Sequence, residues 1–73
     1  MNLVAENIER IIEEKGMKKK VVARRAGITD QKLSDMLAGR AVIRAEIIPN
    51  ICHALDVEPN ALYHQTGGRE AEA

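Results

Sequence analysis

The sequence of 73 residues has almost no aromatic side chains: Tyr63 stands alone, and there is no Phe or Trp. It also has a single cysteine, Cys52, so no disulfide can form within the chain, and a lone thiol fits a reducing compartment. A chain of this length buries only about 60% of its unfolded surface. The small core must therefore be built from Ile, Leu, Val, Met and Ala, a composition that suits packed helices in a single domain.

Long apolar runs are missing as well. Glu6, Glu9 and Arg10 fall where a signal peptide needs an uninterrupted apolar segment, and no stretch reaches the roughly 18 apolar residues of a membrane span. One cysteine and two histidines without ligand spacing do not make a zinc site, and no set of residues for catalysis is present. We therefore expect a cytoplasmic protein that is not an enzyme and has no membrane partner, metal, cofactor or small-molecule substrate.

The apolar residues that are present repeat at the spacing of a helix, and no stretch alternates as a β-strand does. Glycines and the N-cap candidate Thr29 separate the repeating stretches. Helices are predicted over residues 3–15, 18–26, 30–38, about 45–55 and 58–63. Cys52 lies on the apolar side of the fourth, so we interpret it as a small buried hydrophobe rather than a nucleophile. The prediction is an all-α, five-helix bundle over residues 1–64, followed by a flexible tail over 65–73.

The charges are unevenly distributed, although 11 basic residues balance 11 acidic ones. Residues 15–44 contain two acids, Asp30 and Asp35, against nine basic residues: Lys15, Lys18, Lys19, Lys20, Arg24, Arg25, Lys32, Arg40 and Arg44. The segments on either side are acidic. A basic patch of this kind attracts a polyanion such as nucleic acid whatever the total charge. The alternative is an ordinary solvated surface.

Residues 17–40 have the pattern of two short helices joined by a tight turn. Val22 and Ala23 allow the first helix to lie on the second, Gly27 permits the turn, and Leu33 and Leu37 anchor the second helix. This arrangement resembles the XRE-like family of Cro-type and phage-repressor-type helix-turn-helix domains. A second matching block, residues 48–62, follows at the separation that the family shows, so that the resemblance covers about residues 8–63.

The resemblance implies a compact bundle of the phage-repressor DNA-binding-domain type with a central helix-turn-helix. It implies a sequence-specific transcriptional regulator of phage or prophage type, a repressor, whose third helix enters the major groove of double-stranded DNA. Such proteins bind pseudo-palindromic operators as homodimers. Candidates for a dimer surface are Val42, Ile43, Leu62 and Tyr63, with burial in the core as the competing explanation.

Four residues of the third helix are carried over as base-contact candidates: Asp30, Gln31, Ser34 and Asp35. Gln31 is the strongest, because a glutamine amide pairs bidentately with adenine. Asp30 is better explained by the favourable dipole at a helix N-terminus. Asp35 has three alternatives: it reads a cytosine, pairs with a nearby basic residue such as Lys32, or points away.

Phosphate contacts are expected from six basic residues: Lys18, Lys19, Lys20, Lys32, Arg40 and Arg44. Three lysines at a helix start oppose the helix dipole, and a phosphate at that end removes the conflict. The alternative is an exposed run that improves solubility. For Arg24 and Arg25, stabilisation of the helix C-terminus is at least as good an explanation as a DNA contact. The acids on the reading helix also motivate a second hypothesis, a protein-interaction module of antitoxin-like or anti-repressor type that keeps this fold.

Overall fold

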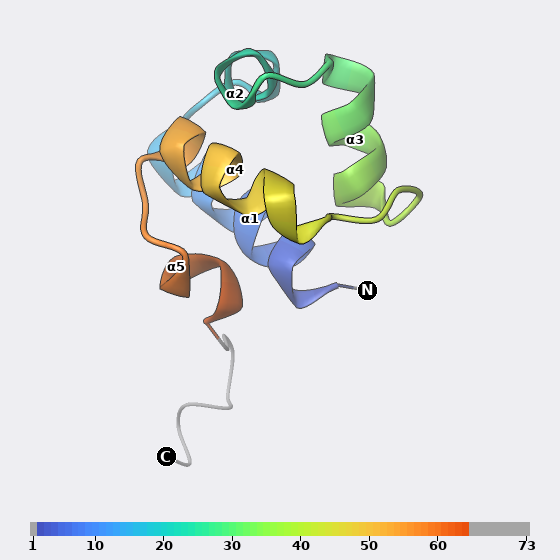
Figure 1. Cartoon of the computed structure of the whole chain (residues 1–73). Coiled ribbons are helices and arrows are strands. Elements are labelled where there is room, and N and C mark those ends of the chain that lie inside the picture. Colours follow the sequence, from blue (N-terminus) through green and yellow to red (C-terminus); the bar gives the residue numbers. More distant parts are fainter. Residues whose placement is uncertain (1, 65–73) are drawn as a thin grey trace.

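The structure, a computed structural model, describes residues 2–64, and the regular secondary structure of this part of the chain is all helical. Five α-helices and one turn of 3-10 helix follow one another: α1 (Leu3–Lys15), α2 (Lys19–Ala26), α3 (Asp30–Ala38), η1 (Ala45–Ile47), α4 (Ile48–Leu55) and α5 (Asn60–Tyr63). Figure 1 shows α2 nearly end-on above α4, with α3 running down beside it. The predicted all-α, five-helix fold is confirmed; the predicted tail over 65–73 lies outside the described residues.

Local side-chain bonds explain where α1 and α3 begin. The Asn2 side chain accepts hydrogen bonds from the backbone N–H groups of Val4 and Ala5, at 2.8 and 3.3 Å. The Thr29 hydroxyl accepts one from the Lys32 N–H at 3.0 Å. Caps of this kind stabilise a helix by about 1 kcal/mol each, because they satisfy N–H groups that have no partner inside the helix.

Helix α4 ends at Leu55, as the sequence predicts, but it ends without the glycine that follows the first three helices. Asp56 follows it in the left-handed conformation, with φ of 59°, in a position where glycine is the usual choice. The N–H groups of Asp56 and Val57 donate to the carbonyls of His53 and Cys52. The ammonium of Lys15, in the last turn of α1, donates to the Asp56 carbonyl at 3.3 Å. Aspartate tolerates this conformation better than most residues, so that the chain turns toward α5 without a glycine.

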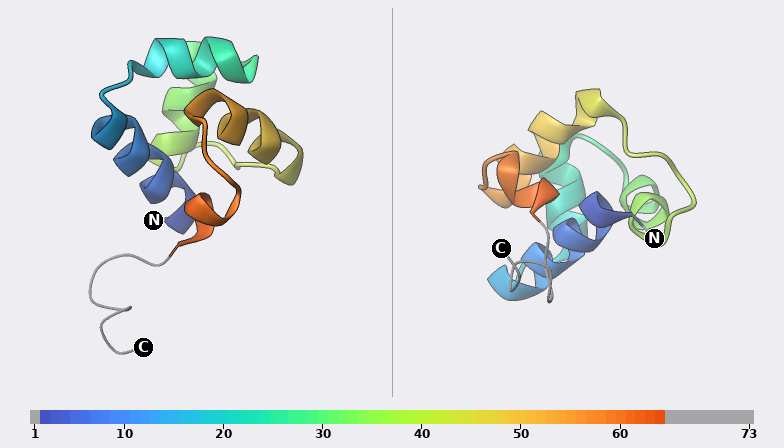
Figure 2. Two further views of the ribbon diagram at one scale, coloured as in Figure 1. Left: turned by 90° about the vertical axis from the view of Figure 1, so that its left-hand side faces the viewer. Right: turned by 90° about the horizontal axis from the view of Figure 1, so that it is seen from below.

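Every α-helix contributes at least one fully buried aliphatic side chain to the core, for example Ile8, Val22, Leu33, Leu55 and Leu62. Helix α2 packs on both α3 and α4, and α1 packs on α3 and α5; Figure 2 shows the same arrangement from two other sides. Cys52 is buried in this core, and burial raises the pKa of its thiol. Its interpretation as a small buried hydrophobe is confirmed.

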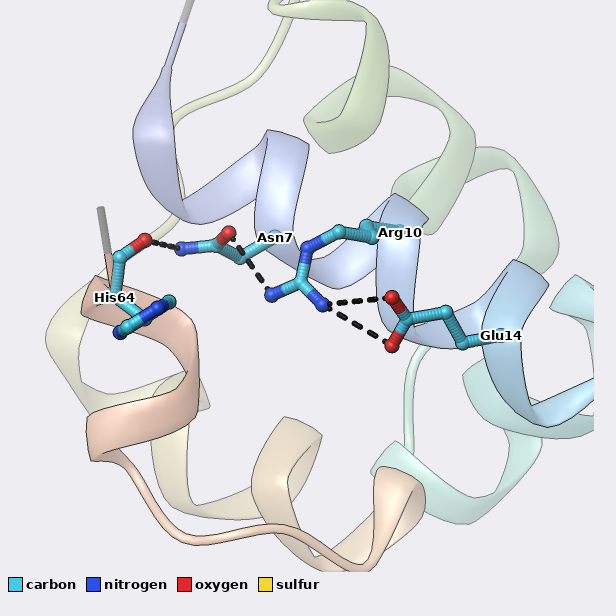
Figure 3. Close-up of polar contacts among 4 residues, drawn as sticks. All are labelled: Asn7, Arg10, Glu14 and His64. Atoms are coloured by element: carbon cyan, nitrogen blue, oxygen red, sulfur yellow. Dashed lines mark hydrogen bonds and ion pairs between the residues drawn. The ribbon is translucent and has the colours of Figure 1, made fainter. Parts of the chain in front are cut away.

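One polar side chain, Asn7, is as deeply buried as the core. Its amide nitrogen donates to the carbonyls of Leu62 and His64, at 2.8 and 2.9 Å, and its carbonyl oxygen accepts from Arg10 at 3.2 Å. Arg10 also pairs with Glu14 at 3.1 Å, as Figure 3 shows. Asn7 therefore joins α1 to the C-terminal end of α5, where helix carbonyls lack partners within the helix.

Candidate nucleic-acid interface

The two central helices form a helix-turn-helix around the residues 27–29. Gly27 has a φ of 78°, which turns the chain sharply after α2. Thr29 then caps α3. The buried sides of α2 and α3 face the core through Val22 and Ala23 of one helix and Leu33 of the other. Figures 1 and 2 show the two helices crossing at a steep angle, with α3 at the edge of the molecule.

The outer side of α3 carries all four candidates for base contact. Asp30, Gln31 and Ser34 are exposed, and Asp35 is partly exposed. The opposite side of the helix, with Leu33, Met36 and Leu37, is buried. The core thus holds α3 by one side and leaves its polar side, including Gln31, open to a partner. Asp30 occupies the first turn, where an acid suits the helix dipole.

Asp35 is bonded to two neighbours along this outer side. Its Oδ1 accepts from the Gln31 Nε2 at 3.0 Å and from the Arg40 Nε at 3.1 Å, and the Arg40 Nη2 lies 3.0 Å away. The hydrogen bond from Gln31 and the guanidinium of Arg40 lower the pKa of Asp35, which keeps it ionised. Among the alternatives for Asp35, pairing with a basic residue is what the structure has, but that residue is Arg40 and not Lys32.

The start of α2 is cationic and has no side-chain cap. Lys18 is the N-cap residue without a capping hydrogen bond, and no acid lies in the first turn, which contains Lys19 and Lys20. All three lysines are exposed. The ammonium of Lys19 pairs with Glu9 of α1 at 3.1 Å. Within residues 2–64, Lys18 and Lys20 form no ion pair. The backbone N–H groups of this end and the ammonium groups of Lys18 and Lys20 therefore remain available to an anion.

Two more of the expected phosphate contacts lie beside a shallow pocket between α3 and α4. Lys32 of α3 and Arg44, just before η1, line an open pocket of about 330 Å³ that also contains Ile28, Glu46 and Asn50. Both cations are exposed. The fold thus brings two positive charges, 12 positions apart in the sequence, to one side of the recognition helix candidate. Arg40 differs, because its guanidinium is engaged by Asp35.

The four candidates for a dimer surface divide between surface and core. Val42 and Tyr63 are 72% and 54% exposed, and they are the large hydrophobic residues left open to solvent in the described part of the chain. Ile43 is half-buried against the core. Leu62 is completely buried, so it belongs to the core and not to a dimer surface.

No helix between residues 2 and 64 is both long and apolar enough to span a membrane. In the same range, no three His, Cys, Asp or Glu side chains gather as a metal site requires.

Comparison with known proteins agrees with this geometry. No curated protein and no solved structure matches the chain. One family does match: the sequence model of the Cro/C1-type HTH DNA-binding domain aligns with residues 7–65, which include all the helices from α2 to α5 and most of α1. Domains of this family are generally not enzymes. The helix-turn-helix of α2 and α3, the exposed polar side of α3 and the family match together show that the chain belongs to the family of Cro/C1-type helix-turn-helix DNA-binding domains.

Proposed function

We propose that the protein is a transcriptional regulator that binds double-stranded DNA in a sequence-specific manner, with α3 in the major groove. One observation carries this proposal: the polar side of α3, with Gln31 and Ser34, is exposed while its apolar side is held by the core. A rigid helix that presents polar side chains outward is what the major groove accommodates. Gln31 and Ser34 are the residues that we assign to base edges, and Asp30 is assigned to the helix dipole.

The DNA backbone is assigned to the cations around α3. Lys18, Lys19 and Lys20 meet one strand at the start of α2, where free backbone N–H groups add to their charge. Lys32 and Arg44 meet the backbone on the other side of α3, beside the pocket that they line. Arg40 keeps N–H donors beyond those that bond Asp35, because guanidinium has five. Phosphate contacts on both sides of one helix fix its register in the groove.

The regulator that we propose is a repressor of phage or prophage type acting in the cytoplasm. Occupation of a promoter is enough for repression and needs no further domain. Binding as a homodimer to a pseudo-palindromic operator fits a single reading helix, because one helix contacts only a short half-site and a dimer doubles the interface. Val42 and Tyr63, the exposed hydrophobic residues, are the assigned dimer contacts.

The alternative function, a protein-interaction module, is not favoured. Its motivation is the pair of acids on the outer side of α3, which repel phosphate. One of them, Asp35, is neutralised by Arg40 at 3.0 Å, and the other, Asp30, occupies the first helical turn. The electrostatic objection to DNA is therefore largely removed.

Selection of bound sequences from a random pool of DNA duplexes tests this function. Enrichment of a short motif with dyad symmetry is the expected result, and affinity for it should fall steeply with salt as counterions are released. Lys19→Ala should reduce the slope of log K against log salt by about one unit. Absence of any enriched motif contradicts sequence-specific binding, and affinity that salt leaves unchanged contradicts the phosphate contacts.

A further inference from the structure

The exposed polar network on α3 is centred on one carboxylate oxygen. One oxygen, the Oδ1 of Asp35, receives the Gln31 Nε2, the Arg40 Nε and the Arg40 Nη2, all between 3.0 and 3.1 Å. Gln31 lies one turn before Asp35 on the same side of the helix. Arg40 lies beyond the helix end, where Gly39, with a φ of 84°, turns the chain back. The Arg40 and Ala41 N–H groups both donate to the Asp35 carbonyl, at 2.8 and 3.1 Å.

The carboxylate determines how the Gln31 amide is oriented. A glutamine amide can turn over and exchange its oxygen with its nitrogen, and the two orientations present opposite patterns to a partner. An ionised carboxylate only accepts hydrogen bonds. The Gln31 Oε1 therefore cannot face Asp35 without repulsion, and the Nε2 must do so, as it does at 3.0 Å.

What remains on the outer edge of Gln31 is one acceptor and one donor. The Nε2 carries two hydrogens, and only one is donated to Asp35. The second hydrogen and the Oε1 form the pair that adenine requires, since adenine offers an acceptor at N7 and a donor at N6 in the major groove. Arg40 supports this arrangement, because it holds the carboxylate in place from the other side and balances its charge.

We propose that Asp35 is a positioning residue for DNA reading: without contacting a base, it fixes the Gln31 amide in the orientation that selects adenine. This inference rests on the proposed function. It also excludes direct reading of cytosine by Asp35 Oδ1, which already has three donors around it. Specificity at one base pair then depends on two residues, of which only Gln31 touches the DNA.

The experiment compares three variants, Gln31→Ala, Asp35→Asn and the double variant, on the site selected by the wild-type protein. Affinity is measured for that site and for the same site with each base pair changed in turn. Gln31→Ala identifies the adenine, because discrimination at that position should fall about tenfold. Asp35→Asn should lose most of the same discrimination at the same position, since the asparagine side chain can either accept from the Gln31 Nε2 or donate to the Gln31 Oε1. The double variant should lose no more than Gln31→Ala alone.

Two controls separate positioning from charge and from folding. Asp35→Glu keeps an acceptor-only group and should recover part of the discrimination, whereas Glu13→Gln on α1 removes one negative charge without affecting it. NMR signals of the Gln31 side-chain amide give a readout that needs no DNA: in the wild type they should show restricted motion, and in Asp35→Asn this restriction should be lost.

The outcomes distinguish the two proposals. If the wild type selects no motif, the proposed function fails, and the NMR comparison alone still reports on the network. If a motif is selected and Asp35→Asn discriminates at the Gln31 position as well as the wild type, the positioning role is wrong. It is equally wrong if Asp35→Asn loses preference for a cytosine at another position, because Asp35 then reads a base itself.

Discussion

Two polar networks in this small protein use the same three kinds of side chain in different surroundings. Asn7, Arg10 and Glu14 form one on α1, and its amide is buried against α5. Gln31, Asp35 and Arg40 form the other on α3, where the amide is exposed. In the first, the amide donates to the main-chain carbonyls of Leu62 and His64, of which the bond to Leu62 is buried. In the second, the amide lies on an exposed helix side. Burial therefore separates the two networks, and we propose that the buried one supports stability and the exposed one DNA recognition.

Removal of the buried amide is the strongest test of this contrast. Asn7→Ala leaves the carbonyls of Leu62 and His64 without their donor, and a buried group without a partner costs about 1–3 kcal/mol. We expect the free energy of unfolding to fall by about 2–3 kcal/mol, measured by urea denaturation. In a domain of this size, each kcal/mol lowers Tm by roughly 4–8 °C.

The matched variant for Asn7→Ala is Gln31→Ala, which removes an exposed amide from the other network. Its stability should stay within about 0.5 kcal/mol of the wild type, as exposed substitutions do, while its DNA discrimination changes. Equal losses of stability in the two variants would show that burial does not separate the networks.

A third ion pair, between Lys19 and Glu9, extends the comparison to the start of α2. Both side chains are about half exposed and lie 3.1 Å apart, and a lysine that binds phosphate must first leave Glu9. An exposed pair of this kind contributes about 0.2–1 kcal/mol. Glu9→Gln should therefore raise affinity for DNA by up to about fivefold at low salt, measured by fluorescence anisotropy.

Glu13→Gln serves as the control for Glu9→Gln, because it makes the same change of charge one turn further along α1. Glu13 is exposed and forms no ion pair within residues 2–64. A gain in affinity that is equal in both variants indicates a general effect of net charge. A gain confined to Glu9→Gln indicates that Lys19 is the group released.

These networks also mark where sequence reasoning succeeded and where it failed. The buried side of α3 followed from the helical repeat of Leu33, Met36 and Leu37, because burial of apolar residues has a local period. Asn7 was missed because its partners are main-chain carbonyls 55 and 57 positions away. Every residue has a main-chain carbonyl, so residue types do not show which carbonyl needs a donor. Only the packing of α5 on α1 brings these two carbonyls to Asn7.

The partner of Asp35 illustrates a different limit. The sequence suggests a nearby basic residue such as Lys32, on the same helix, whereas the observed partner, Arg40, lies beyond the helix end. Gly39 in the left-handed conformation turns the chain so that Arg40 lies beside Asp35. The sequence marks Gly39 as the end of the helix, but it does not show where the next side chain will lie. The Lys19–Glu9 pair was not predicted either, because its two residues lie on different helices. Contacts across a turn or between helices require coordinates.

Within the buried network, the outer ion pair should matter far less than the amide. Arg10 and Glu14 are a pair at positions i and i+4 with side chains 36% and 61% exposed, and such pairs stabilise a helix by about 0.3–0.5 kcal/mol. Glu14→Ala should lower the free energy of unfolding by about that amount in urea denaturation, and added salt should reduce the effect. A loss as large as that of Asn7→Ala would mean that Glu14 positions Arg10 and, through it, the buried amide.

The smallest expected effect is a pH dependence of stability from the exposed network. The bonds from Gln31 and Arg40 hold the pKa of Asp35 below its ordinary value of 3.8. A carboxyl group whose pKa is lower in the folded chain stabilises the fold above the unfolded pKa, and this contribution is lost as pH falls through the folded pKa. Asp35→Asn should thus be slightly less stable than the wild type at neutral pH, and the difference should shrink below pH 3.8.

Urea denaturation of the wild type and Asp35→Asn over a pH series measures this difference, and Glu13→Gln shows what the loss of an acid outside the network does. Acid weakens the interactions of every paired carboxylate. The informative quantity is therefore the difference in the free energy of unfolding between wild type and variant at each pH. A gap that persists unchanged into acid would mean that the ionised carboxylate contributes nothing to the fold. The lower stability of Asp35→Asn would then have a cause other than the lost charge. In that case only the buried network would stabilise the fold, and the exposed network would serve orientation alone.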